Sequence, residues 1–198
     1  MAILNMQILF LLFLPLLSFL ILIFFGKRLG NHSHWVALSL IGVMLLIAIT
    51  FFSKIFLHHD HVHEITRGSF TWFSTGAFSV QLGVFIDNTA AIMMLVVALI
   101  SFLVHLYSVA YMKGDSRYSR YFAFLGLFTF SMNGIVIADS LFMMYVFWEL
   151  VGLSSYLLIG FWFEKKSAAN ACKKAFLTNR VGDIGMFIGI MIFFFTVG

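Results

Sequence analysis

Long runs of apolar residues alternate with short polar stretches along the whole chain. A helix needs about 20 apolar residues to cross a bilayer, and six runs reach or approach that length. They span residues 6–25, 35–57, 85–112, 121–138, 141–163 and 175–197. The fourth and fifth runs meet at Asp139, where we expect a turn, because the joined stretch is too long for one crossing. The pattern predicts an all-α polytopic membrane protein with about six transmembrane helices in a single membrane domain, residues 1–198.

The stretch between the second and third runs has a different period. From Gly68 to Leu82, apolar and polar residues alternate on both sides of Ser74, Thr75 and Gly76. Alternation around a glycine-containing turn is typical of a β-hairpin. We therefore expect a short hairpin outside the bilayer.

Pro15, the one proline of the chain, lies inside the first predicted helix. Proline removes a hydrogen bond from a helix, and in membranes the neighbouring helices can compensate. We expect a tolerated kink at this point. Lys27 and Arg28 follow this run instead of preceding it, so the run does not have the pattern of a cleaved signal peptide.

The composition and the charges fit this interpretation. The chain is 62% hydrophobic and 10% charged, whereas a soluble domain is about 45–50% apolar and about 25% charged, so a soluble protein is excluded. The first, third and fifth loops contain ten of the 12 basic residues. The positive-inside rule places these loops in the cytoplasm, with the N-terminus and the hairpin outside. The single cysteine, Cys172, can form neither an internal disulfide nor a cysteine-rich metal site.

Glu149 places a carboxylate deep inside the fifth apolar run. A charge at bilayer depth costs roughly 2.5–3.5 kcal/mol on insertion scales, and Glu149 lies about 12 Å along its helix, near the bilayer midplane. Tyr145, Gly152 and Tyr156 share its helical face, so we expect that face to point into the bundle. Burial favours the neutral carboxyl and a nearby cation favours the charged one, as a reversible proton carrier requires. The alternative is a carboxylate that only hydrogen-bonds a neighbouring helix.

Other ionisable residues accompany Glu149, and each has two interpretations. Asp183 lies near mid-depth in the sixth helix, with Asn179 and Arg180 one turn before it. An Arg180–Asp183 pair is either a structural salt bridge or part of a proton path. Lys173 and Lys174, at the inner mouth of the same helix, either set the topology and contact headgroups or bias a proton path.

Histidines occur within one helix and in one loop. His105 lies in the third predicted helix, where it either relays protons near neutral pH or forms an interhelical hydrogen bond. The stretch from His58 through His63 to Glu64 contains four histidines and two carboxylates, a composition that can bind Zn²⁺ or Cu²⁺. It lacks the spacing of a structural metal site. We therefore interpret it as a solvated loop and predict no metal.

The sequence contains no P-loop, no G-x-G-x-x-G fingerprint and no set of iron–sulfur cysteines. We expect this chain to hold no cofactor and to handle neither nucleotides nor electrons itself.

Several motifs resemble those of a known family. Residues 148–161 resemble the fifth helix, and residues 171–183 are similar to the sixth helix, of the L subunit of bacterial NADH:quinone oxidoreductase (respiratory complex I). Residues 105–112 and the hairpin at 68–87 also match that subunit. The A-type subunit of the Mrp sodium/proton antiporters belongs to the same superfamily. The resemblance extends over essentially the whole chain.

This resemblance implies an antiporter-like bundle in the membrane arm of complex I that couples electron transfer to proton transport. It implies that Glu149 is a key ionisable residue, with Arg180 and Asp183 as polar neighbours. NADH, FMN, the Fe–S clusters and quinone would belong to partner subunits, and the partners would be other membrane-arm subunits, lipid and protons, with no nucleic acid. The expected location is the bacterial inner (plasma) membrane.

Members of this family continue into a seventh, broken helix with a lysine thought to pair with the glutamate. This sequence ends after the sixth apolar run. We therefore expect it to correspond to an N-terminal fragment of a longer subunit. An A-type subunit of a Mrp antiporter and an inactive truncated fragment are the alternatives.

Overall fold

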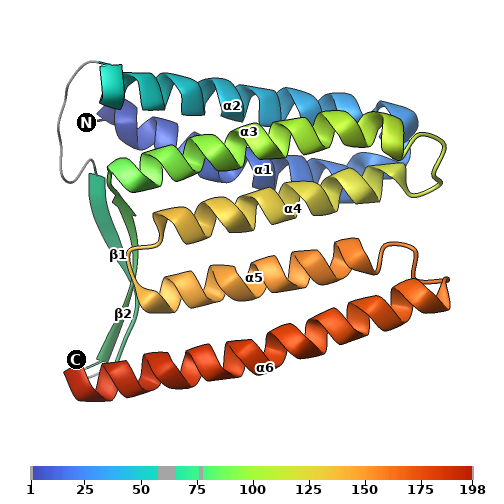
Figure 1. Cartoon of the computed structure of the whole chain (residues 1–198). Coiled ribbons are helices and arrows are strands. Elements are labelled where there is room, and N and C mark those ends of the chain that lie inside the picture. Colours follow the sequence, from blue (N-terminus) through green and yellow to red (C-terminus); the bar gives the residue numbers. More distant parts are fainter. Residues whose placement is uncertain (1, 58–65, 76–77, 198) are drawn as a thin grey trace.

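The structure is a computed structural model that describes residues 2–57, 66–75 and 78–197. These residues form six α-helices, one short 3-10 turn and two strands (Figure 1). In chain order they are α1 (Ala2–Leu29), η1 (Gly30–His32), α2 (Ser33–Leu57), β1 (Thr66–Thr75), β2 (Phe78–Ile86), α3 (Asn88–Tyr111), α4 (Tyr118–Ile137), α5 (Leu141–Ile159) and α6 (Lys166–Val197). The prediction of about six helices and a hairpin is confirmed for these residues.

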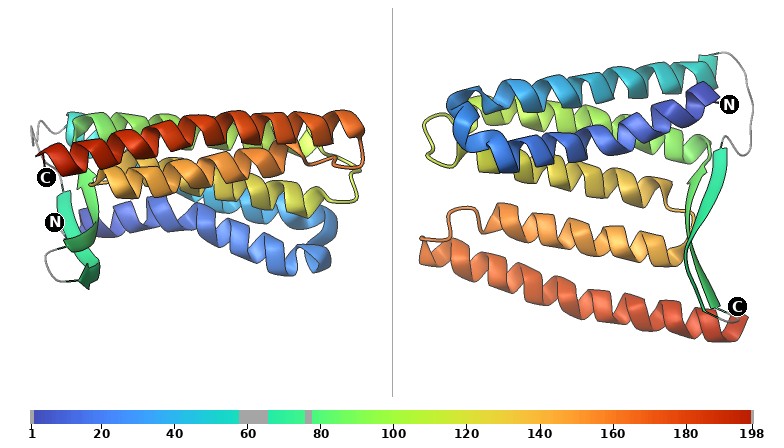
Figure 2. Two further views of the ribbon diagram at one scale, coloured as in Figure 1. Left: turned by 90° about the horizontal axis from the view of Figure 1, so that it is seen from below. Right: turned by 180° about the vertical axis from the view of Figure 1, so that it is seen from behind.

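The helices run side by side, and each is antiparallel to the next along the chain (Figures 1 and 2). The helices α1 to α4 form a bundle, α5 packs beside α4, and α6 packs beside α5 at the edge. Most of the buried core lies within α1 to α4, whereas α5 and α6 bury few of their side chains. Val181 and Phe195 of α6, for example, are 73% and 76% exposed. Because burial inside the protein cannot account for these side chains, their surroundings must be apolar.

Five helical stretches in the described residues are long and apolar enough to cross a membrane. The first of them, Met6–Phe56, covers most of α1 and of α2. The chain is a membrane protein.

The connections expected as the first, third and fifth loops lie at one end of the bundle, with basic residues in them and in the adjoining helix turns. The α1–α2, α3–α4 and α5–α6 connections meet there, opposite the hairpin and both chain ends (Figure 1). The indole N–H of Trp162 donates to Asp115 Oδ2 at 2.9 Å, and Arg117 pairs with Glu164 at 2.9 Å. The α3–α4 and α5–α6 connections are thus joined directly, so the predicted grouping of the odd loops on one face is confirmed.

Several helix boundaries differ from those expected. The third helix begins at Asn88 instead of residue 85, because the Asp87 carboxylate caps it by accepting from Ala90 N at 2.7 Å, which leaves Phe85 and Ile86 in β2. The fourth helix begins three residues early, at Tyr118. The fifth ends at Ile159, and the sixth begins at Lys166 instead of 175. Helix α6 therefore extends beyond its apolar run.

The hairpin closes one end of the molecule. Its strands are antiparallel, with Thr66 opposite Ile86 and a register shift between Thr71 and Phe73. The predicted turn at Asp139 separates α4 from α5, and it docks on β2: the Asp139 N–H donates to the Gly83 carbonyl at 3.2 Å. A side chain at Gly83 would bring its Cβ within 2.7 Å of the Asp139 Cβ. The close approach of strand and turn therefore depends on glycine.

Helix α1 continues through Pro15 because α4 supplies the missing hydrogen bond. Proline has no N–H, so the carbonyl of Leu11, four residues earlier, lacks its usual intrahelical donor. The side-chain amide of Asn133, from α4, donates to that carbonyl at 2.9 Å. Asn133 is only 2% exposed. The expected compensation by a neighbouring helix is confirmed, whereas the kink stays a prediction.

Candidate functional site

Helix α5 positions Glu149 near mid-depth. The hydroxyl of Ser140 caps the helix by accepting from Met143 N at 3.2 Å, and apolar residues continue the helix to Ile159. Glu149 lies eight residues after the first residue, Leu141, which is about 12 Å along a helix some 28 Å long. The carboxylate is therefore far from both ends.

Glu149 is held by two groups from the α5–α6 layer. The hydroxyl of Tyr145, one turn earlier in α5, donates to Glu149 Oε1 at 2.7 Å. The guanidinium of Arg180, from α6, forms an ion pair with Glu149 Oε2. The same guanidinium lies over the ring of Phe176, 4.9 Å from its centroid. The carboxylate thus has a donor at each oxygen.

Asp183 lies one turn beyond Arg180 and has a different partner. Its side chain is 5% exposed, and its Oδ1 accepts from the indole N–H of Trp148 at 3.1 Å. The expected Arg180–Asp183 pair is not the arrangement found. Because Glu149 faces Arg180 across the helix interface, it takes the guanidinium, and the neighbouring indole satisfies Asp183.

Aromatic pairs flank this polar cluster on both sides along the interface. Tyr145 packs on Phe187 at 5.5 Å between ring centroids, and Tyr156 packs on Phe176 at 5.4 Å. Tyr145 and Tyr156 thus face α6 together with Glu149, so the predicted direction of this face is confirmed. The charges thus lie between two aromatic contacts along the α5–α6 interface.

We call Glu149, Arg180 and Asp183, with the donors Tyr145 and Trp148, the α5–α6 cluster. It contains two carboxylates and one guanidinium, so it has one negative charge in surplus when both carboxylates are ionised. An uncompensated charge away from water is unfavourable. The cluster is therefore suited to take up one proton.

His105 lies elsewhere, on the α3 face that packs against α4. It is 1% exposed, and its Nδ1 lies 2.8 Å from the carbonyl of Ser101. Since a carbonyl only accepts, Nδ1 carries the proton and Nε2 is the acceptor. Nε2 has no hydrogen-bond partner within the described part of the chain. The hydroxyl of Ser101 lies 2.6 Å from the hydroxyl of Thr129, in α4, so the two side chains are hydrogen-bonded.

Helix α4 separates His105 from the α5–α6 cluster (Figures 1 and 2). A cavity of about 340 Å³ lies between α3 and α4 and reaches Leu158 of α5. Its lining is almost wholly aliphatic and aromatic, apart from Ser101, His105 and Thr129. Ordered water needs polar partners, so this cavity offers no continuous proton wire.

The remaining candidates do not join the cluster. Lys173 and Lys174 are exposed and lie inside α6, because that helix begins at Lys166. Lys173 is two turns before Arg180, on a similar side of the helix. The stretch from His58 to His63 lies outside the described residues, and no group of three metal-binding side chains occurs within the described ranges. The roles of all these residues in proton transfer stay predictions.

Trp148 is the member that sequence reasoning missed. Its position directly before Glu149 hid it among apolar neighbours. A buried indole N–H normally finds an acceptor, and in lipid the acceptor must come from another helix. That rule would have indicated Trp148 as a second contact between α5 and a polar residue of the bundle.

Two family models match the chain. Residues 72–122 match the N-terminus of chain 5 of NADH-ubiquinone oxidoreductase (complex I). Residues 138–198 match the transmembrane region shared by NADH:quinone oxidoreductase and the Mrp antiporters. The second match contains all members of the α5–α6 cluster.

Individual proteins are similar over most of the chain. The chloroplastic NAD(P)H-quinone oxidoreductase subunit 5 of Chlorokybus atmophyticus is 46% identical over 156 residues, which is 79% of this chain and 24% of that protein. Chain 5 of the Synechocystis enzyme is 48% identical over 127 residues, 64% of this chain and 19% of that protein. The chain spans about a quarter of the length of the curated relatives it matches.

A solved structure has the same fold. A chain of the membrane-bound sulfane sulfur reductase, an archaeal respiratory membrane complex, superimposes with a TM-score of 0.79. It is 19% identical, and the match covers 96% of this chain and 37% of that chain.

Proposed function

This chain belongs to the antiporter-like family that includes chain 5 of NADH:quinone oxidoreductase, and we propose that it forms the N-terminal part of a proton-translocating membrane-arm subunit of that enzyme. In this proposal NADH, FMN, the Fe–S clusters and quinone are bound by partner subunits, and this chain moves protons. The observation that supports it most directly is the α5–α6 cluster, with its surplus negative charge at mid-membrane depth.

The geometry suggests how a proton could be held and released. A proton on Glu149 removes the charge that holds Arg180, and the neutral carboxyl keeps its hydrogen bond with Tyr145. Asp183, one turn along α6, is then the other carboxylate of the cluster available to Arg180. The guanidinium would thus alternate between two carboxylates, and the proton would occupy the one it leaves.

Lys173, Lys174 and His105 have supporting roles in this proposal. The two lysines lie between the basic end of the bundle and Arg180, so their charges bias proton entry from that end. His105 acts as a separate proton-accepting site beyond α4, through Nε2. Transfer between His105 and the cluster requires a conformation other than the present one, because the intervening cavity is apolar.

The Glu149→Gln substitution tests this proposal. Glutamine keeps the size and an acceptor for Tyr145 but cannot carry a charge. In the assembled enzyme, proton translocation per NADH oxidised should fall by about tenfold or more. Proton uptake into vesicles and NADH oxidation are measured on the same preparation.

The Glu164→Gln variant is the matched control, because Glu164 is an exposed carboxylate at the end of the bundle. It should pump normally. Undiminished proton translocation by the Glu149→Gln variant would remove the cluster from the mechanism.

The second candidate is the A-type subunit of a Mrp sodium/proton antiporter, because the family matched by residues 138–198 includes these proteins. The two candidates differ in what drives transport. Proton movement that requires NADH and persists without sodium supports the first. Proton movement driven by a sodium gradient, with no response to NADH, supports the second.

We further propose the bacterial plasma membrane as the location, with the N-terminus outside. The orientation is supported by the lysine and arginine residues in and beside the α1–α2, α3–α4 and α5–α6 connections together with the positive-inside rule.

A further inference from the structure

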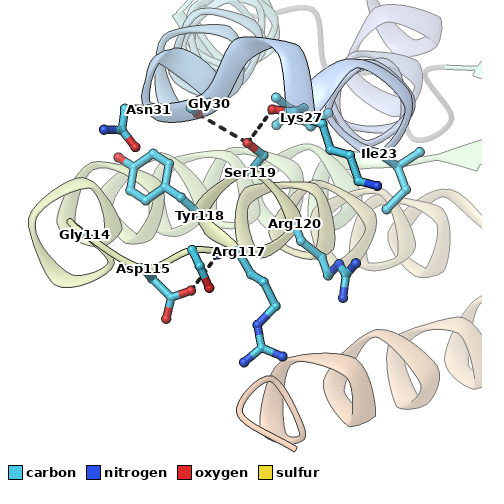
Figure 3. A pocket seen from close by; sticks show the side chains of 13 residues that line it. Ile23, Lys27, Gly30, Asn31, Gly114, Asp115, Arg117, Tyr118, Ser119 and Arg120 are labelled. Carbon is cyan, nitrogen blue, oxygen red and sulfur yellow. Dashed lines mark hydrogen bonds between the residues drawn. The ribbon is translucent and has the colours of Figure 1, made fainter.

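A cavity of about 680 Å³ opens at the basic end of the bundle, well away from the α5–α6 cluster. It lies between the last turns of α1 and the first turn of α4, with the α3–α4 connection along one side (Figure 3). The proposed proton path does not use it.

Two of its cations lack an acidic partner. Lys27 and Arg120 form no ion pair with any carboxylate in residues 2–57, 66–75 and 78–197. Their side chains extend toward the same side of the cavity (Figure 3).

The other two charged residues of the cavity are already engaged. Arg117 pairs with Glu164 at 2.9 Å. Asp115 accepts from the Trp162 indole at 2.9 Å and from Arg117 N at 2.8 Å. Desolvation raises the pKa of Asp115, but these hydrogen bonds and the Arg117 charge together outweigh it and lower the pKa overall. The Asp115 carboxylate is therefore ionised, yet it lies at the far end of the cavity from Lys27 and Arg120 (Figure 3).

The walls of the cavity are fixed by a short polar contact between α1 and α4. The hydroxyl of Ser119 donates to the Gly26 carbonyl at 2.9 Å and lies 2.5 Å from the hydroxyl of Ser33. A Cβ at Gly26 would be 2.7 Å from the Cβ of Ser119. The two helices thus approach closely here, and the opening beside Lys27 and Arg120 is built into the backbone.

The cavity is polar at its water-facing end and apolar toward the lipid. Leu22 and Ile23 line it about one turn, or 6 Å, deeper in the membrane than Gly26 and Lys27. Ile23 is 40% exposed and lies beside the Lys27 amine (Figure 3). A free phosphate ion gains nothing from an apolar wall, whereas an amphiphile with an anionic head gains from both surfaces.

We propose that this cavity binds an anionic phospholipid, with Lys27 and Arg120 on the phosphate and with Ile23 against the first methylenes of an acyl chain. Guanidinium and ammonium groups are the usual partners of phosphate oxygens. Basic pockets between helices at the cytoplasmic face are suited to anionic headgroups.

The test uses the assembly that carries this chain, titrated with phosphatidylglycerol or phosphatidylcholine and analysed by native mass spectrometry. The unmodified assembly should bind phosphatidylglycerol in preference to phosphatidylcholine. The double variant Lys27→Gln/Arg120→Gln should bind one phosphatidylglycerol roughly 30-fold more weakly, with phosphatidylcholine binding unchanged.

The matched control is Lys165→Gln/Lys166→Gln, which removes the same charge from exposed positions at the start of α6 outside the cavity. It should bind phosphatidylglycerol normally. The charge-conserving variant Lys27→Arg/Arg120→Lys should retain binding within about threefold, which separates loss of charge from loss of fold.

Three results would overturn the proposal. The first is equal phosphatidylglycerol binding by the unmodified assembly and the Lys27→Gln/Arg120→Gln variant. The second is an equal loss in the α6 control, which would indicate unspecific attraction. The third is displacement of the lipid by millimolar glycerol 3-phosphate, which would assign the cavity to a soluble phosphate.

Discussion

Trp148 and Glu149 are neighbours in α5, and each contacts a different charged residue of α6. Glu149 meets Arg180, and the Trp148 indole meets Asp183. The carboxylates of Glu149 and Asp183 therefore cannot change partners independently. A shift of Arg180 toward Asp183 would compete with the indole for the same carboxylate, so Trp148 limits how easily the second pairing forms.

The Trp148→Phe substitution should weaken the α5–α6 contact. Phenylalanine keeps an aromatic ring but removes the donor to a buried charged acceptor, a loss of about 1.5–3 kcal/mol in unfolding free energy. Denaturant unfolding measures this loss. Trp35→Phe is the control, because Trp35 is 66% exposed, and it should change the unfolding free energy by less than about 0.5 kcal/mol. Equal effects of the two substitutions would contradict the assigned hydrogen bond.

Glu149 could be singled out from the sequence, since a carboxylate inside an apolar run is conspicuous by itself. Its helical face followed from spacing, and Tyr145 and Tyr156 do face α6. The ion-pair partner of Arg180 could not be predicted from the sequence. Spacing within α6 favours Asp183, whereas the choice of Glu149 depends on how far α5 and α6 slide and rotate against each other. Those two quantities belong to the packed pair and leave no local pattern.

Helices α1 and α4 are coupled through the gap in hydrogen bonding at Pro15. Asn133 replaces the missing intrahelical donor to the Leu11 carbonyl. Close approach of the two backbones makes this possible, because a Cβ at Gly126 of α4 would be 3.0 Å from the Pro15 carbonyl oxygen. The hydrogen bond that replaces the proline's missing donor thus joins α1 to α4.

A double-mutant cycle should show this coupling. Asn133→Leu leaves the Leu11 carbonyl without a donor and should cost about 1–2 kcal/mol in unfolding free energy. In a Pro15→Ala background the helix can form its own bond to Leu11, so the same substitution should cost less by about 1 kcal/mol. Unfolding in a denaturing detergent gives all four values. An identical cost in both backgrounds would show that Asn133 does not replace the proline's missing donor.

Helices themselves were predictable, while their ends were less so. Apolar runs located all six, because length and hydropathy alone decide which segments can cross lipid. The start of α3 was misplaced because Phe85 and Ile86 suit either a strand or a helix, and the Asp87 cap decides between them. Helix α6 starts at Lys166, before its apolar run, because lysine and alanine favour a helix regardless of hydropathy. Hydropathy carries no information about either feature.

The two ends of the bundle differ in charge. The α1–α2, α3–α4 and α5–α6 connections lie opposite the hairpin, and lysine and arginine residues occur in them and in the adjoining helix turns. If the basic end faces the cytoplasm, the orientation of every loop follows, and the lipid cavity beside Lys27 lies in the cytoplasmic leaflet.

Single cysteines in a Cys172→Ser background test this orientation. Ser116 and Ser74 are both exposed, one at each end of the bundle. A membrane-impermeant maleimide added to intact cells should label Ser74→Cys, and Ser116→Cys should react only after the membrane is opened. The reverse labelling pattern would show that the molecule has the opposite orientation in the membrane. It would place the proposed lipid cavity in the outer leaflet.

The strand β2 holds the reversal between α4 and α5 through the hydrogen bond from the Asp139 N–H to the Gly83 carbonyl and through the close approach at Gly83. Helix α5 therefore cannot tilt away from α4 without moving the hairpin or breaking that hydrogen bond. If Glu149 takes up a proton as proposed, a resulting movement of α5 would be transmitted to the hairpin at the water-facing surface. An antibody fragment bound to the hairpin would then restrict the movement of α5 without contacting that helix.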